Sequence, residues 1–342
     1  MKIADPTQAI APGKLILSGE HSVVYGNPAL VMAVNRYVTT TVLPQTGSHI
    51  TFCFPHLSAE RHVRLTDLMQ LQDRIRQNYH HFLNGELTIR EVLREPVELV
   101  LFALSLLFEA VNMESDIGMR MTMQTDILIG CGMGSSAAVV LSVLTALAAY
   151  LKANVSSEMF FNLAQQAENM QHGKSSGLDL QSVLQGGCLY FKEGQVTART
   201  PSLLPLYLIN TGQPQTSTGE CVTLAANYFK NTQIGHDFAM VTDAMDNALQ
   251  CNNMADFILT VRENHKLLNT IGVVPQKVQH FIAEIEQNGG AAKISGAGAV
   301  AGNNAGAVIV AIQDKTVLHK ITDRYQQEII PIQCEARGVY VN

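Results

Sequence analysis

The sequence has few charged side chains, no basic character overall and no long uninterrupted apolar segment. Charged residues make up 15% of its 342 positions and hydrophobic residues 47%, a balance typical of packed globular proteins rather than disordered chains. The formal net charge of −6 argues against a broad basic face, so we expect no nucleic-acid partner. Residues 97–111 and 137–151 are the most apolar stretches, and both are too short to span a membrane.

Metal-binding cysteine pairs and an apolar leader are missing too. The six cysteines are scattered and form no CxxC pair. Because a chain of this length builds its own core, it has little need of disulfides, and we expect reduced thiols. Residues 1–10 contain no apolar run like that of a signal peptide. Together these absences predict a cytoplasmic protein without a membrane partner.

Apolar residues recur with two different periods along the chain, which indicates both strands and helices. The predicted strands lie within 14–42 and at 119–129, 187–191, 206–210, 293–295, 308–312 and 338–341. The predicted helices lie within 59–113 and at 137–151, 157–171, 220–229, 237–249, 254–268 and 277–287. Strands and helices without strict alternation favour an α+β architecture. A polar stretch around Pro201 suggests two domains, residues 1–195 and 196–342.

A glycine-rich segment joins the predicted strand at 119–129 to the apolar helix that follows it. Its residues are Gly130, Cys131, Gly132, Met133, Gly134, Ser135, Ser136, Ala137 and Ala138. Glycines let backbone amides approach a phosphate, the helix start offers unpaired N–H groups, and the serine hydroxyls can bind a phosphate oxygen or a magnesium ion. A tight turn with a serine N-cap is the alternative interpretation. No lysine follows as in a Walker A loop, and Ser135 stands where a dinucleotide fingerprint needs its third glycine.

Two carboxylates, Glu168 and Asp179, lie on either side of a polar turn. Glu168 comes late in a predicted helix, and Asp179 follows a Ser-Ser-Gly sequence. Such a pair could serve one magnesium ion and one proton transfer. The alternative is a solvent-exposed glutamate and an ordinary turn aspartate, and His172 by itself is more typical of a structural histidine than of a catalyst.

A second glycine-rich segment extends from Lys293 to Gly302. Gly296, Gly298 and Ala301 satisfy the GxGxxA pattern in form. That fingerprint should open a helix, whereas here the chain continues through Asn-Asn-Ala-Gly into a predicted strand. We therefore expect a backbone-lined loop that contacts a ligand or the other domain, rather than a nicotinamide-binding turn.

Together with the N-terminal run from Ala11 to Gly26, APGKLILSGEHSVVYG, these segments resemble the three motifs of the GHMP kinase superfamily. The motifs occur in the expected order and span residues 11 to about 310. Within the superfamily, the GEHSVVYG stretch is most similar to the mevalonate kinases, and so are the turn from His172 to Asp179 and the segment from Asn264 to Val273. The resemblance implies a two-domain GHMP kinase fold. Its N-terminal domain would be like domain 2 of ribosomal protein S5, its C-terminal domain ferredoxin-like, and ATP and the acceptor would lie between them.

The resemblance also implies a reaction, the ATP-dependent phosphorylation of mevalonate to 5-phosphomevalonate for isoprenoid synthesis, with Mg²⁺ as cofactor and a homodimer as the assembly. Asp179 would be the catalytic base, and Lys14 would lie beside it and stabilise charge at the attacking oxygen. Ser136, or else Ser135, and Glu168 would hold the magnesium ion. The residues expected to bind ATP are Gly130, Gly132, Met133, Gly134, Ser135, Ser136 and Ala137. The residues expected at the acceptor are Glu20, His21, His172, Ser176, Gly296 and Ala297.

The chain departs from the family pattern at two places. The last motif usually continues as a run of glycines, but alanine and valine follow Gly298 here. Gln215 lies in a loop that, by the resemblance, would face the substrate. Relatives tend to carry a basic residue at this position. Three alternatives stay open: another kinase of the superfamily, acting on phosphomevalonate, homoserine or a sugar; a non-catalytic ligand sensor; and a nicotinamide dehydrogenase.

Four arginines are set apart from these motifs. Arg74, Arg76, Arg90 and Arg94 are interpreted as a solvent-exposed helix face. In the alternative interpretation, part of this region folds over the nucleotide.

Overall fold

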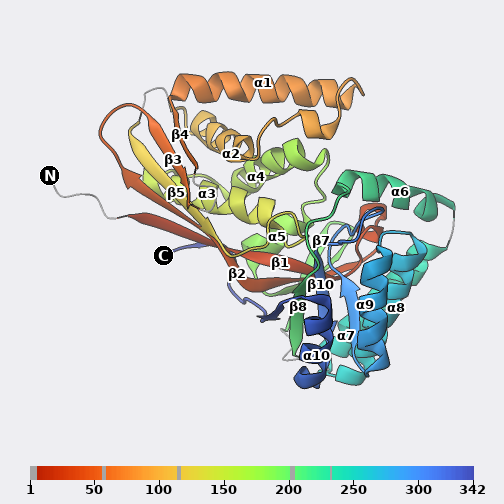
Figure 1. Ribbon diagram of the computed structural model, residues 1–342. Helices are drawn as coiled ribbons and strands as arrows, with labels where there is room; N and C mark the ends of the chain where they lie inside the picture. Colours follow the sequence, from red (N-terminus) through yellow and green to blue (C-terminus); the bar gives the residue numbers. More distant parts are fainter. Residues whose placement is uncertain (1–5, 56–58, 114–116, 201–204, 232) are drawn as a thin grey trace.

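The computed structural model describes residues 6–55, 59–113, 117–200, 205–231 and 233–342 (Figure 1). Two β-sheets, each packed against its own helices, organise these residues. The mixture of strands and helices confirms the predicted α+β class.

The first sheet has eight strands and is formed mainly by the N-terminal part of the chain. Its strands are β1 (Thr7–Ser18), β2 (Ala29–Pro44), β3 (Ile50–Phe54), β4 (Ala59–Val63), β5 (Met119–Thr125), β6 (Cys188–Lys192), β7 (Gln195–Arg199) and β12 (Tyr340–Val341). The main order is β12-β1-β2-β5-β3-β4, and β6 pairs with both β2 and β7. Only the β3–β5 pair is parallel. A short 3₁₀ helix, η1 (Ser22–Tyr25), follows β1 directly.

Helices α1 to α5 form a layer on this sheet (Figure 1). They are α1 (Leu65–Leu83), α2 (Val97–Ala110), α3 (Ser135–Leu151), α4 (Ser157–His172) and α5 (Leu178–Gln185), with the 3₁₀ helix η3 (Ile89–Glu91) before α2. Helix α3 is apolar on nearly every face because it lies between the β1–β2 ladder and helices α2 and α4. Because α3 is buried, its position is fixed, and so is the position of the glycine-rich loop that precedes it.

The second sheet and its helices form the other half of the molecule, drawn in teal and blue in Figure 1. Its strands are β8 (Leu206–Asn210), β9 (Ala291–Ile294), β10 (Ala307–Ala311) and β11 (Ile329–Ile332), in the antiparallel order β11-β8-β10-β9. Its helices are α6 (Thr218–Asn231), α7 (Ile234–Gln250), α8 (Met254–Thr270), α9 (Gln276–Gln287) and α10 (Lys315–Tyr325). Strand β10 is completely buried, and the apolar side chains around it form a separate core.

Most predicted elements are confirmed, but residues 59–63 were expected to be helical and instead form β4. This segment pairs with β3, a long-range contact that overrides its local sequence preference. Helices α5 and α10 and strands β7 and β11 were not predicted; α5, for example, is only eight residues long and begins after Gly177. The β6–β7 hairpin crosses the expected domain boundary between residues 195 and 196, and β12 returns to the first sheet, so the division into 1–195 and 196–342 stays a prediction.

The expectations about thiols and membranes can be compared with the fold as well. All six cysteines are free thiols, as expected. Within the described ranges, none of the helices combines the length and the apolar character that crossing a membrane requires.

Candidate active site

Lys14 and Asp179 are 165 positions apart in the sequence but form an ion pair, with 3.0 Å between Nζ and Oδ1. Lys14 comes from β1 and is 3% exposed, whereas the Asp179 side chain, in the first turn of α5, is 32% exposed. The backbone N–H of Lys14 donates to the Met133 carbonyl at 2.9 Å, and its Nζ donates to the Gly132 carbonyl at 3.4 Å. The structure therefore brings the two expected catalytic residues together beside the glycine-rich loop.

That loop depends on glycines in the left-handed region. Gly132 and Gly134 have φ values of +84° and +68°. A Cβ at Gly132 would lie 2.3 Å from the Ser295 carbonyl oxygen, and one at Gly134 would lie 2.7 Å from Cγ of Lys14. Glycine is therefore required for the loop to lie directly against both the last motif and the lysine.

Helix α3 begins at this loop without a side-chain cap. Its N-cap is Gly134, and Ser135 is already the first helical residue, so the alternative of a serine N-cap is wrong. The first-turn amides and the positive end of the helix dipole are thus presented toward Lys14, Ser136 and their neighbours. This is the arrangement in which helices bind phosphate.

Glu168 is a buried carboxylate near the start of α3. It is 1% exposed, and its Oε1 atom has no hydrogen-bond partner among the described residues. Its Oε2 atom lies 3.7 Å from Nε2 of His172, which lies 3.1 Å from the Ser136 hydroxyl oxygen. Burial, together with the negative charge of Asp179, raises the pKa of Glu168 to about 8. A buried carboxylate with one unpartnered oxygen favours either a proton or a cation beside that oxygen.

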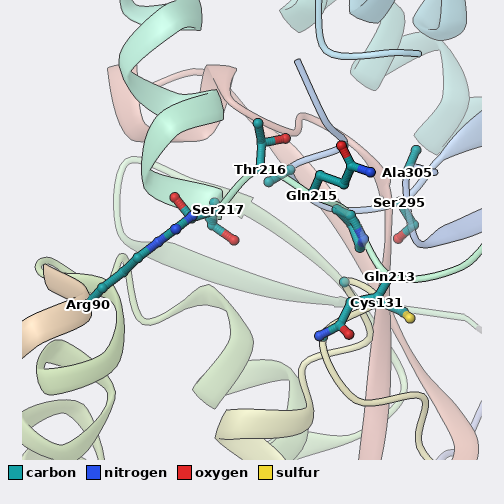
Figure 2. Close-up of a pocket in the computed structure, with 14 residues that line it drawn as sticks. Arg90, Cys131, Gln213, Gln215, Thr216, Ser217, Ser295 and Ala305 are labelled. Atoms are coloured by element: carbon teal, nitrogen blue, oxygen red, sulfur yellow. The ribbon is translucent and has the colours of Figure 1, made fainter. Parts of the chain in front are cut away.

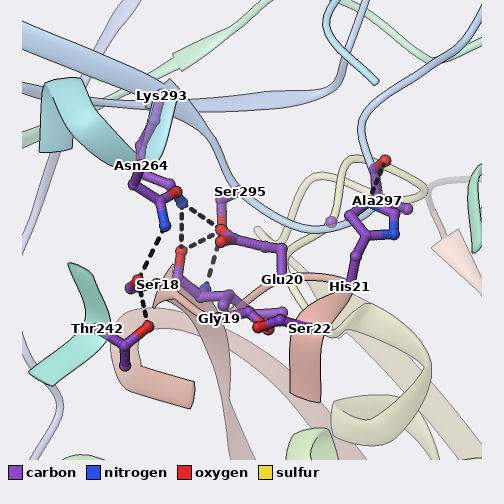
Figure 3. A network of polar contacts seen from close by, with 12 residues as sticks. Ser18, Gly19, Glu20, His21, Ser22, Thr242, Asn264, Lys293, Ser295 and Ala297 are labelled. Carbon is purple, nitrogen blue, oxygen red and sulfur yellow. Dashed lines mark hydrogen bonds and ion pairs between the residues drawn. The ribbon is translucent and has the colours of Figure 1, made fainter. Parts of the chain in front are cut away.

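Glu20 and His21, expected at the acceptor, lie in a buried polar cluster between the two sheets (Figure 3). Glu20 forms an ion pair with Lys293 of β9, and both side chains are 1% exposed. His21 is held with its Nε2 atom 3.0 Å from the Ala297 carbonyl oxygen. The carboxylate of Glu20 therefore faces Lys293, a partner that the motif comparison did not identify. The sequence contained a signal for such a pair, because Lys293 lies within the apolar strand sequence AAKI and a buried lysine needs an acidic partner.

The same cluster continues into the helices of the second half. The hydroxyl oxygens of Ser18 and Thr242 are 2.7 Å apart, and the Asn264 amide donates to Ser18 at 2.9 Å. Thr242 belongs to α7 and Asn264 to α8. Hydrogen bonds thus join the end of β1 to both helices.

The remaining expected acceptor residues lie in two loops. The Ser176 hydroxyl accepts a hydrogen bond from the N–H of Leu178 at the start of α5. Gly296 approaches Gly132 so closely that a Cβ on it would lie 3.1 Å from the Gly132 Cα. The last motif then continues through a loop into β10, not into a helix, which removes the basis for a nicotinamide-binding turn.

A polar cavity of about 240 Å³ lies beside the glycine-rich loop (Figure 2). Its lining comes from the glycine-rich loop, the last motif, the loop between β8 and α6, and η3: Arg90, Gly130, Cys131, Gly132, Gln213, Pro214, Gln215, Thr216, Ser217, Thr218, Ser295, Ala297, Gly298 and Ala305. Arg76, Arg90 and Arg94 are exposed, as interpreted, but the four arginines do not share one helix face. Arg74 and Arg76 belong to α1, where Arg74 pairs with Glu98, whereas Arg90 belongs to η3 and lines this cavity.

A second, mainly apolar cavity of about 160 Å³ lies at the start of α3. Among its lining residues are Val97, Val100, Met123, Ser136 and Val139. Ser136 therefore lies between an apolar pocket and the buried Glu168, and no sequence motif indicated this pocket.

Comparisons with known proteins agree with this geometry. Residues 98–187 match the family model of the GHMP kinases N terminal domain. A mevalonate kinase from Archaeoglobus fulgidus is 30% identical, over 85% of this chain and 88% of its own length. The crystal structure of the Methanococcus jannaschii mevalonate kinase superposes with a TM-score of 0.79 at 20% identity, covering 97% of this chain and 99% of that one. The L. major mevalonate kinase in complex with R-mevalonate gives a TM-score of 0.71 at 18% identity, covering 98% of this chain and 99% of that one.

The motifs, the fold and the level of identity all lead to one assignment. The family model matches the segment that contains the glycine-rich loop, Glu168 and Asp179. The similarity to the A. fulgidus protein extends over most of both chains. The chain therefore belongs to the GHMP kinase family, and the A. fulgidus relative at 30% identity is a mevalonate kinase.

Proposed function

We propose that this chain transfers the terminal phosphoryl group of ATP to the hydroxyl of mevalonate, giving 5-phosphomevalonate and ADP. The observation that carries the proposal is the Lys14–Asp179 ion pair, 3.0 Å long, beside the uncapped start of α3. The relatives named mevalonate kinase, one of them crystallised with R-mevalonate, support this choice of acceptor.

The chemistry follows from the position of the two charges. The acceptor oxygen attacks the terminal phosphorus, a new O–P bond forms, the bond to the ADP oxygen breaks, and the hydroxyl proton passes to Asp179. Lys14 stabilises negative charge at the attacking oxygen. The first amides of α3 bind the phosphate oxygens on which charge accumulates. Positioning and charge neutralisation are thus the main contributions of the protein.

Magnesium fits the residues beside this pair. Glu168 has a buried oxygen without a partner, and Ser136 adds a hydroxyl nearby. Magnesium is usually bound in proteins by one or two carboxylates together with substrate phosphates, rather than by a full protein cage. No cluster of three or more acidic, histidine or cysteine residues suited to a metal occurs in the part of the chain that the structure describes, which agrees with that mode. When bound, the ion would neutralise phosphate charge.

The purine ring of ATP would occupy the apolar cavity next to Ser135 and Ser136. Val97, Val100 and Met123 offer it an apolar surface, and the phosphates would then extend toward the first turn of α3. A cytoplasmic location and a homodimer stay predictions.

An ADP-release assay over a panel of acceptors tests the proposal. Mevalonate should support turnover with ATP and Mg²⁺, whereas phosphomevalonate, homoserine and galactose should not. Turnover with one of the other acceptors and none with mevalonate would assign the chain to another kinase activity of the family. Nucleotide binding without turnover on any acceptor would instead favour the sensor.

A further inference from the structure

Among the described residues that line the polar cavity, Arg90 is the one with a charged side chain. It belongs to η3 in the first half of the molecule, and Figure 2 shows it extending toward Ser217 at the start of α6. Its Nη2 atom lies 2.8 Å from Oε2 of Glu220. The backbone N–H and hydroxyl of Ser217 donate to that same carboxylate oxygen, at 2.6 and 2.7 Å. The ion pair between Arg90 and Glu220 thus joins the two halves of the molecule beside the cavity.

The guanidinium group of Arg90 still has donors to offer. Only its Nη2 atom has a hydrogen-bond partner among the described residues, which leaves Nε and Nη1 open. The hydrogen bonds from Ser217 and the charge of Arg90 lower the pKa of Glu220, which is therefore an ionised partner that occupies only Nη2 of the guanidinium group. An arginine fork with two open donors is well suited to a carboxylate.

The other described residues of the lining include no lysine or arginine. Gln213, Gln215 and Thr216 contribute neutral polar groups. An anionic group that enters this cavity therefore finds its counter-charge at Arg90.

The cavity also adjoins the reacting groups. Gly132 belongs to its lining, and the Gly132 carbonyl accepts a hydrogen bond from Nζ of Lys14. Ala297 belongs to the lining as well, and its carbonyl contacts His21. An acceptor in this cavity would therefore lie against residues that contact Lys14 and His21, with Arg90 in the same lining.

We propose that Arg90 binds the carboxylate of the acceptor. The proposal rests on the proposed function, because mevalonate carries its carboxylate at the end opposite the hydroxyl that is phosphorylated. Arg90 is then a specificity-determining residue, and its partner Glu220 is not needed for acceptor binding.

Steady-state kinetics of two matched variants test this assignment. Arg90→Gln removes the cation, and a lost charge-assisted contact should raise the KM for mevalonate about 10- to 100-fold. The kcat and the KM for ATP should stay unchanged. Glu220→Gln breaks the same ion pair but keeps the cation, so its KM for mevalonate should equal that of the wild type or be lower. An equal increase in the KM for mevalonate in both variants would mean that the ion pair only holds the two halves of the molecule together. This result would overturn the proposal.

Two further comparisons sharpen the result. Gln215→Arg introduced into the Arg90→Gln variant should recover most of the lost affinity, since it restores a cation to the cavity. The triol analogue of mevalonate, which has a hydroxymethyl group in place of the carboxylate, should bind the wild type weakly and show no further loss in Arg90→Gln. If Arg90→Gln weakened binding of the triol as much as it weakened binding of mevalonate, carboxylate binding would be contradicted. An increase in the KM for ATP alone would contradict it as well.

The two proposals fail in different ways. Turnover of mevalonate by the wild type with an unchanged KM in Arg90→Gln overturns the Arg90 assignment alone. Absence of mevalonate turnover in the wild type overturns the proposed function and the Arg90 assignment with it. Because Arg90 is 61% exposed, Arg90→Gln should fold normally, which circular dichroism can verify.

Discussion

The aliphatic stem of Lys14 lies directly against the backbone of Gly134, leaving no space for a side chain there. A Cβ at this glycine would lie 2.7 Å from Cγ and 2.9 Å from Cε of the lysine. The loop that is proposed to bind phosphate and the lysine that is proposed to stabilise the attacking oxygen are therefore positioned by one another.

Gly134→Ala should lower both stability and kcat. The left-handed conformation at φ +68° costs an alanine about 1–2 kcal/mol, and the Cβ must also displace Lys14. Gly194→Ala is the control, because Gly194 has a φ of +79° but has open space around its Cβ position. It should lose stability and keep kcat. Thermal unfolding and ADP-release assays separate the two effects, and an equal kcat in both variants would contradict the proposed coupling to Lys14.

Asp179→Asn should preserve ATP binding and reduce kcat by about 10² or more, the size of a typical acid–base contribution. The amide keeps the shape of the side chain but cannot accept the proton. Asp73→Asn, on the exposed face of α1, serves as control and should behave like the wild type. Near-normal turnover by Asp179→Asn would exclude Asp179 as the base.

Glu168 should make the stability of the ligand-free protein depend on pH. Its pKa is raised from 4.5 to about 8, so between these values the folded protein holds a proton that the unfolded chain has released. The free energy of unfolding should therefore fall as pH rises through this window, by up to about 1.4 kcal/mol per pH unit. Glu168→Gln removes this dependence and should be more stable than the wild type at pH 8, with a smaller difference at pH 5.

Urea unfolding at several pH values, without nucleotide or metal, measures that difference. Glu158→Gln, an exposed substitution on the same helix, should follow the wild-type pH profile. MgATP should stabilise the wild type more than Glu168→Gln, if Glu168 binds the metal. A Glu168→Gln profile parallel to that of the wild type would show that the carboxylate is not held protonated.

Lys293→Met should destabilise the fold by about 3–5 kcal/mol, because it leaves the buried Glu20 carboxylate without its partner. The double variant Glu20→Gln/Lys293→Met removes both charges and should recover much of the loss. Lys266→Met breaks an exposed ion pair with Glu263 and should change little. Urea midpoints give all three values. Equal stability of Lys293→Met and Lys266→Met would show that the buried pair has no special role.

The sequence indicated the glycine-rich loop that is proposed to bind phosphate, because its signals are local: closely spaced glycines, an apolar helix and adjacent serines. The contact between Lys14 and Asp179 could not be derived from spacing, since it joins β1 to α5, and it was expected only from the resemblance to the GHMP kinases. The Lys293–Glu20 pair and the position of Arg90 were missed for the same physical reason. Each depends on how the two halves of the molecule pack, and a local pattern such as the lysine in AAKI indicates that a partner is needed without identifying it.

The most direct test of the account is a structure of the chain bound to mevalonate and a non-hydrolysable ATP analogue with Mg²⁺. The account predicts the terminal phosphorus at the first turn of α3, with the acceptor hydroxyl within hydrogen-bond distance of Asp179 and next to Lys14. A terminal phosphate bound away from that helix start, or a hydroxyl facing away from both side chains, would contradict it.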